Sequence, residues 1–470
     1  MAARRGLVHS GLFLAGLALA TLWPISAYAA GPMVLPGLLL LAAAGFLVAR
    51  RPEYGVAIAL ALAPWTNLNL GEQGRPLRLV IPALAIGMVA YGAIVSSRDA
   101  TGRRPLAGAV ALFVAASLAA SGQALEPSAS LTKLGGLITA AALFFAVLLI
   151  CRDRGQLLVV AAGAVAGLFL ASGQGMVQQA LGQFSELGFV ADGEIVQRVQ
   201  GSFGHPNQYA GFLAVLMPLA ATMLVTRAVP TRMRWLAGAA LALAMPALVL
   251  SYTRGALLGL VLGSLVWLAF VKPRAAVAVA LSVGLVGAAL APGLLKERFV
   301  NESNSGDVSI RADLWGSALD IYTQRPLLGV GLNNFENGYA RLPATLANAS
   351  QRRLLHQGQV LTPPHAANLY LNILAEEGLL GILAFAFFSF VAVTTTYRGC
   401  RVRDPAGRAV CLGLGAGLMT LALHSFLEVT LFSEVSMPLF ALLGVAATYV
   451  ALEREAPPER EPVVTSGPAA

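Results

Sequence analysis

Three stretches of this 470-residue chain place polar and charged side chains at the ends of strongly apolar segments. They are GSFGHPNQYAGF (201–212), SYTRGALLGL (251–260) and HAANLYLNILAEEGLLG (365–381). Histidine can accept a proton at neutral pH, and arginine presents a planar fork of N–H donors that matches phosphate groups. Because such groups are costly beside membrane hydrocarbon, their recurrence at these positions indicates a function.

A narrow polar face runs through the third stretch. At about 100° per residue, a helix from His365 onward would carry four polar residues on one side and apolar residues elsewhere. These four are His365, Asn368, Asn372 and Glu376. A functional face and the solvated side of a helix at the membrane surface fit this pattern equally well.

The basic residues and His205 also have purely structural interpretations. Arg254 lies in a short turn between two apolar segments, where an arginine can extend to phospholipid headgroups. Arg198 can be a solvated loop charge. His205 can mark the start of a helix, because Pro206 suits a first helical turn and Asn207 suits a cap.

Composition indicates an integral membrane protein. The chain is 57% hydrophobic and only 12% charged, with a mean hydropathy of +0.72, whereas a soluble domain carries about 25% charged residues. Apolar runs of about 16–20 residues recur along the chain, so we predict an all-α polytopic membrane protein with about 12–14 transmembrane helices. The expected spans lie near 8–27, 32–49, 54–65, 78–95, 106–121, 134–150, 157–175, 208–226, 235–250, 256–271, 275–294, 378–397, 410–427 and 434–452.

The distribution of basic residues predicts a cytoplasmic N-terminus. Under this assumption the inside segments hold 20 of the 32 Lys and Arg residues. The outside segments hold 12, of which seven lie in one long loop, 296–364, whose length exempts it from the rule. The remaining comparison of 20 with five supports this orientation. It also accounts for the net charge of +9 without nucleic acid as a partner.

The predicted spans divide the chain into three parts. Residues 1–195 form N-terminal transmembrane helices, and residues 196–452 form a membrane domain that includes the outer loop 296–364. Residues 453–470, rich in Pro and Glu, are expected to be a disordered cytoplasmic tail. The first apolar segment also imitates a secretory signal peptide, although we favour a retained helix. In the outer loop, 309–322 has helical periodicity, and Gly329, Gly331 and Gly338 indicate a sharp turn.

The ordered set of motifs resembles the O-antigen ligase and polymerase family of bacterial envelope glycosyltransferases. The resemblance covers roughly 195–430 and depends mainly on four stretches. These are Phe-Gly-His-Pro-Asn, Ser-Tyr-Thr-Arg-Gly, RPLLGVGLNNF, and the run from Asn-Leu-Tyr-Leu to Glu-Glu-Gly-Leu-Leu-Gly. The resemblance implies a GT-C-like enzyme of the cytoplasmic (inner) membrane, with its active site facing the periplasm or exterior.

The same resemblance implies the substrates. The donor would be an oligosaccharide on a polyprenyl (undecaprenyl) diphosphate carrier, and the acceptor would be a sugar hydroxyl of a glycan or glycolipid, in contact with membrane lipids. Transfer would be inverting and would need no cofactor and no metal. The absence of acidic residues from 28–32 and of an Asp-x-Asp motif from the long loop agrees with the expectation of no metal.

Roles for individual residues follow from the resemblance. The family's functional arginines correspond to Arg254 and Arg198, and its loop-to-helix histidine corresponds most nearly to His365. Fixed guanidiniums would stabilise a diphosphate leaving group, and a neutral imidazole would take the proton of the acceptor hydroxyl. Family members commonly carry histidine directly before the asparagine, whereas this chain has Ala367 there.

The identity of the base therefore stays open between His365, His356 and Glu376. Further contacts with substrate are expected from six residues: His205, Asn207, Asn368, Tyr370, Asn372 and Glu376. His424 and Glu428, in a neighbouring segment, would support them.

Two other functions are compatible with parts of the sequence. A lipid-linked glycan transporter or flippase should place charges at the bilayer midplane and show related halves, whereas here the distinctive residues cluster at one face and no repeat is visible. A non-catalytic scaffold for envelope assembly predicts that replacing Arg254 or His365 leaves glycan products unchanged. Within the enzyme interpretation, ligase and polymerase use the same donor chemistry, and the sequence does not separate them.

Overall fold

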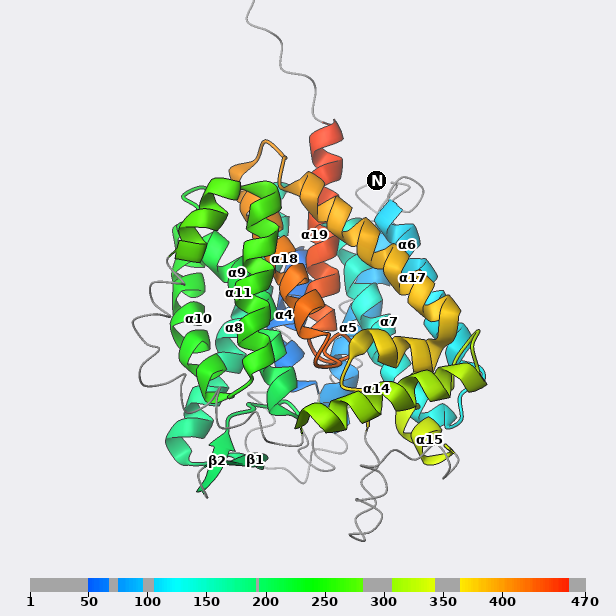
Figure 1. Cartoon of the computed structure of the whole chain (residues 1–470). Helices are drawn as coiled ribbons and strands as arrows, with labels where there is room; N and C mark the ends of the chain where they lie inside the picture. Colours follow the sequence, from blue (N-terminus) through cyan, green and yellow to red (C-terminus); the bar gives the residue numbers. More distant parts are fainter. Residues whose placement is uncertain are drawn as a thin grey trace, which may run out of the picture.

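A computed structural model describes residues 50–66, 75–95, 105–191, 194–281, 307–342 and 364–455. Within these ranges the chain is a bundle of helices with one two-stranded hairpin (Figure 1). The first two predicted spans, the possible signal peptide, His356 and part of the predicted span 275–294 lie outside the described residues.

The elements follow one another with mostly short connections. The N-terminal helices are α4 (Pro52–Leu62), α5 (Arg75–Val95), α6 (Pro105–Ser121), α7 (Pro127–Ile150) and α8 (Arg154–Leu181), with a short 3-10 helix η1 (Ala63–Trp65) after α4. The hairpin β1 (Ser185–Ala191) and β2 (Glu194–Arg198) precedes α9 (Pro206–Val225), α10 (Thr231–Leu250) and α11 (Arg254–Val271). The C-terminal helices are α14 (Asp307–Gln324), α15 (Phe335–Ala340), α17 (Leu369–Gly399), α18 (Pro405–His424) and α19 (Ser436–Glu455).

Eight of the described helices are long and apolar enough to cross a membrane: α7, α8, α9, α10, α11, α17, α18 and α19. Shorter apolar stretches in α5 and α6 add to these. The protein is therefore an all-α polytopic membrane protein, as predicted. Some helix boundaries differ from those of the predicted spans, because the polar residues at helix ends are not part of an apolar run. α7 starts at Pro127, which suits a first helical position, and α19 continues to Glu455, past the predicted start of the tail.

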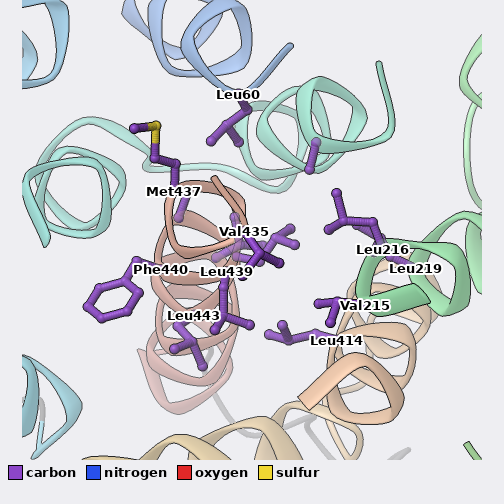
Figure 2. Packing of buried hydrophobic residues seen from close by; sticks show 14 of the residues in the cluster. Leu60, Val215, Leu216, Leu219, Leu414, Val435, Met437, Leu439, Phe440 and Leu443 are labelled. Carbon is purple, nitrogen blue, oxygen red and sulfur yellow. The ribbon is translucent and has the colours of Figure 1, made fainter. Parts of the chain in front are cut away.

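The centre of the bundle is formed by α9, α18 and α19. Their side chains gather in one cluster (Figure 2): Val215 and Leu219 from α9, Leu414 from α18, and Leu439 and Leu443 from α19. α18 approaches α9 closely because it presents glycines four residues apart. A Cβ on Gly413 would lie 2.5 Å from the Cα of Leu219, and a Cβ on Gly417 would overlap the Val215 carbonyl oxygen.

One end of the bundle carries the hairpin, α14, α15 and the starts of α9, α11 and α17 (Figure 1). The helix predicted for 309–322 is confirmed as α14. α14 packs on α17, and its Ala318 and Ile321 are fully buried in a small apolar cluster with Ala375. The long loop therefore contributes an ordered helix to the same end as the polar motifs.

α17 is interrupted at Gly378, where φ is 66° and ψ is −161°. The carbonyls of Ala375 and Glu376 accept hydrogen bonds from Val330 N–H (3.1 Å) and Gly331 N–H (2.8 Å). The glycine turn predicted before α15 is confirmed, since φ is +66° at Gly329 and +104° at Gly331. The loop thus supplies partners for backbone groups that the helix break leaves open, as a membrane helix requires.

Candidate active site

The helices α9, α11 and α17 begin at this end of the bundle, and two of these three are capped by side chains of the predicted motifs. The His205 Nδ1 caps α9 by accepting a hydrogen bond from Asn207 N–H (3.0 Å). The Asn368 Oδ1 caps α17 by accepting from Tyr370 N–H (3.0 Å) and Leu371 N–H (3.1 Å). α11 has no side-chain cap, and its first residue is Arg254. Each start contributes the positive end of a helix dipole, so the region favours anions.

The Glu428 carboxylate, in the segment between α18 and α19, links the start of α9 to the segment just before α17. It is buried, with one oxygen accepting from the Asn207 amide (Nδ2 to Oε2, 2.7 Å). The other oxygen accepts from Val429 N–H (3.1 Å) and lies 3.3 Å from the His365 Nε2. Burial by itself raises the pKa of Glu428, but the facing His365 and these hydrogen bonds lower it below its ordinary value. The carboxylate is therefore ionised at neutral pH.

His365 has a defined tautomer. Its Nδ1 accepts a hydrogen bond from Ala367 N–H (3.1 Å), which places the ring proton on Nε2, facing Glu428. Burial lowers the pKa of His365, Glu428 partly opposes this, and the charges of Lys133 and Arg311 lower it further. The imidazole is therefore neutral at neutral pH, with its lone pair on Nδ1 and a carboxylate behind Nε2.

Arg198, expected in a loop, instead ends strand β2, paired with Ser185 of β1. Its Nε donates to the Ser251 carbonyl (2.9 Å), and its Nη2 donates to the Asn207 Oδ1 (2.7 Å) and the Thr253 hydroxyl (3.0 Å). Arg198 thus orients the Asn207 amide toward Glu428 and holds the turn just before Arg254. The burial of His205 lowers its pKa, with Glu428 opposing and Arg198 assisting.

Arg254 follows a turn in which Tyr252 has a φ of 54°, a conformation that is uncommon for a residue other than glycine. Beside it, Gly255 allows His424 of α18 to approach, since a Cβ there would lie 3.3 Å from the His424 Nδ1. His424 is buried, and its ring packs against the backbone near the starts of α9 and α11.

Two basic residues of this region were not among the predicted site residues. The Arg311 Nη1 of α14 donates to the Leu427 carbonyl (2.6 Å), and the Lys133 Nζ of α7 donates to the Phe432 carbonyl (3.1 Å). Both positive charges lower the pKa of His365. The sequence offered a signal for each of them. Lys133 is a charged residue directly before the predicted span 134–150, and Arg311 lies in the helix predicted for 309–322.

The narrow polar face predicted from His365 to Glu376 does not lie on one helix, because α17 begins only at Leu369. Glu376 accepts from Asn333 N–H (2.8 Å) and Phe335 N–H (3.0 Å), one at each oxygen, and so fixes the loop before α15. The side chains of Asn372 and Tyr370 also form hydrogen bonds with backbone groups. The Asn372 Oδ1 accepts from Ala366 N–H (3.0 Å), and the Tyr370 hydroxyl donates to the Ala422 carbonyl (2.8 Å).

The structure therefore brings together Arg198, His205, Asn207 and His365 around Glu428. Arg254 begins α11 directly after the turn that Arg198 holds. Asn368 shapes the start of α17 and donates to the Phe426 carbonyl (3.2 Å). The side chains of Tyr370, Asn372 and Glu376 hold neighbouring backbone instead. Their role as contacts to substrate stays a prediction.

Part of the chain matches a known protein family. Residues 239–386 match the family model described as O-antigen ligase. Comparison with curated proteins gives no match. The matched region includes Arg254, Arg311 and His365, whereas Arg198, Asn207 and Glu428 lie on either side of it. The match agrees with the resemblance seen in the motifs, and it shows that residues 239–386 are similar to the O-antigen ligase family.

Proposed function

We propose that this protein transfers a glycan from a polyprenyl diphosphate carrier to an acceptor sugar hydroxyl, at the outer face of the cytoplasmic membrane. The similarity of residues 239–386 to the O-antigen ligase family supports glycosyl transfer of the O-antigen ligase or polymerase type. The observation that carries the mechanism is the pairing of His365 with the buried Glu428, beside the start of α9 and just before α17.

The cations and helix starts would stabilise the leaving group. As the anomeric bond breaks, negative charge develops on the diphosphate, and fixed N–H donors are most effective when they already point at that charge. Arg254 at the uncapped start of α11 and Arg311 of α14 are our candidates for direct contact, because their guanidiniums match phosphate oxygens. Arg198 acts one step away, by holding Asn207 and the turn before Arg254.

His365 would be the general base. The acceptor hydroxyl takes the place of Ala367 N–H at Nδ1, its oxygen attacks the anomeric carbon opposite the diphosphate, and the carbon–oxygen bond to the diphosphate breaks. The hydroxyl proton passes to Nδ1, and the resulting imidazolium donates from Nε2 to Glu428. Because this is one displacement, the anomeric configuration inverts. Such proton transfer contributes about 10² to 10⁴ in rate.

A divalent ion is not needed in this scheme, because guanidiniums and helix starts meet the charge of the diphosphate. Across the parts of the chain that the structure describes, no group of three or more His, Cys, Asp or Glu side chains has the geometry of a metal site.

The deciding experiment uses the purified protein, a defined polyprenyl diphosphate oligosaccharide and a set of candidate acceptors. We expect transfer, with release of polyprenyl diphosphate, and no transfer by His365→Ala. A single addition would identify a ligase, and a ladder of products would identify a polymerase. Movement of intact donor across a vesicle membrane without transfer would instead indicate a transporter. No transfer by the purified native protein, together with normal glycan products in cells that carry His365→Ala, would indicate a scaffold.

A further inference from the structure

The C-terminal ends of α17 and α19 lie at the end of the bundle opposite the candidate active site (Figure 1). A second polar feature lies between them. It is a recess of about 200 Å³ at the last turns of these helices and the turn that follows α17. Six residues line this basic recess: Arg398, Arg401, Val402, Val450, Glu453 and Arg454. It shares no residue with the candidate active site, so its function is a separate question.

The charge of the basic recess is strongly positive. It contains three arginines and one carboxylate, and that carboxylate, Glu453, is already paired with Arg403 outside the lining (3.2 Å). Arg401 is held over the ring of Tyr397, 4.4 Å from the centroid, and also donates to the Tyr397 hydroxyl. Within the part of the chain that the structure describes, the guanidiniums of Arg398 and Arg454 make no hydrogen bond or ion pair. The recess therefore offers N–H donors to an anion.

An apolar surface continues from the basic recess along α17. Leu383, Phe387 and Phe390 are exposed large side chains on this helix. At about 100° per residue, they lie within about 80° of the direction of Arg398. Val402 and Val450 line the recess itself. An occupant with an anionic group and a long apolar portion would match both surfaces at once, whereas a free anion would match only the arginines.

We propose that the basic recess binds the phosphodiester headgroup of an anionic phospholipid, whose acyl chains lie along the exposed face of α17. The arginines meet the phosphate, and the position at the ends of two membrane-spanning helices places the headgroup at the membrane surface. The bound lipid joins the end of α17 to the end of α19. Binding does not depend on glycosyl transfer, so either proposal can fail alone.

The test is native mass spectrometry of the full-length protein in a neutral detergent, titrated with phosphatidylglycerol or phosphatidylcholine. The recess variant is Arg398→Gln, Arg401→Gln, Arg454→Gln. The matched control is Arg227→Gln, Arg232→Gln, Arg408→Gln, which removes the same charge from exposed arginines at the same end of the bundle. Circular dichroism of both proteins checks their folding, and Arg454→Gln alone serves if the triple variant does not fold.

We expect the native protein to prefer phosphatidylglycerol. Each arginine replaced should lower the affinity for phosphatidylglycerol about five-fold, and the recess variant should lose on the order of a hundred-fold. These values follow from the typical contribution of a basic residue at a membrane surface. The control should stay within a few-fold of the native protein. Equal losses in both variants, or equal binding of the two lipids, would overturn the proposal. Displacement of the lipid by an equal concentration of inorganic phosphate would overturn the choice of a lipid.

Discussion

Replacement of Glu428 by Gln tests the proposed proton transfer most directly. The carboxylate accepts from Asn207 at one oxygen and faces the His365 Nε2–H at the other. A glutamine has only one acceptor oxygen, so in either orientation its NH₂ group faces a donor. Relief of that conflict at His365 requires the proton to move to Nδ1, which already receives Ala367 N–H. The variant therefore loses both the orientation of the base and the stabilisation of its charged form.

The expected loss in kcat is on the order of 10²-fold, about 2.7 kcal/mol, at the lower end of what general-base catalysis contributes. KM for the donor should change little, because the diphosphate is assigned to Arg254 and Arg311. The assay is release of polyprenyl diphosphate from a defined donor, with Glu453→Gln at the far end of the molecule as the control. Its carboxylate pairs with Arg403, remote from the site.

The pH profile separates this role from a merely structural one. His365 acts only when neutral, so activity falls as the pH drops through its pKa, which burial holds below the ordinary value. Glu428 raises that pKa by its charge, so Glu428→Gln should move the acid limb to lower pH. An unchanged kcat, or an acid limb that moves to higher pH, would refute the assignment of His365 and Glu428 as a pair.

Four further outcomes are expected. Lys133→Gln removes a charge that lowers the pKa of His365, so its acid limb should move to higher pH in the same assay; no movement would contradict the geometry. Arg254→Lys should lose about 10²-fold or more in turnover, because an ammonium cannot make the forked contact with phosphate, and full turnover would remove Arg254 from the site. Gly417→Ala should destabilise the protein by about 1–3 kcal/mol in thermal unfolding, whereas Gly108→Ala, which has open space around it, should not; equal transitions would contradict the packing of α18 on α9. Transfer should persist in EDTA, and strict dependence on added Mg²⁺ would overturn the metal-free scheme.

Local features of the fold were predictable because their causes are local. The apolar runs predicted the membrane helices, and Pro206 after His205 predicted the start of α9. The spacing of Ala318 and Ile321 predicted α14, and Gly329 marked a turn that needs a positive φ. Each of these depends on residues within one or two turns of each other, which a single sequence contains.

The single polar helix face predicted for His365 to Glu376 was wrong for a different reason. A helix cap and a helix break replace the continuous helix that the prediction assumed. Asn368 fits the polar face, yet its side chain is more favourable as a cap, because it satisfies two N–H groups at the start of α17. Glu376 fits the same face, but the break at Gly378 turns it toward the loop before α15. Periodicity assumes a continuous helix, and it fails where a cap or a break interrupts one.

Glu428 and Arg311 show why the composition of the site could not be predicted in full. They approach His365 only because α14 and the segment after α18 pack around the start of α17, over 50 residues away in each direction along the chain. Burial of an ionised carboxylate costs free energy that its partners often only balance, and an apolar side chain of similar size would stabilise the fold as well or better. The presence of Glu428 at this position is therefore better explained by the proton transfer that we propose for it than by the stability of the bundle.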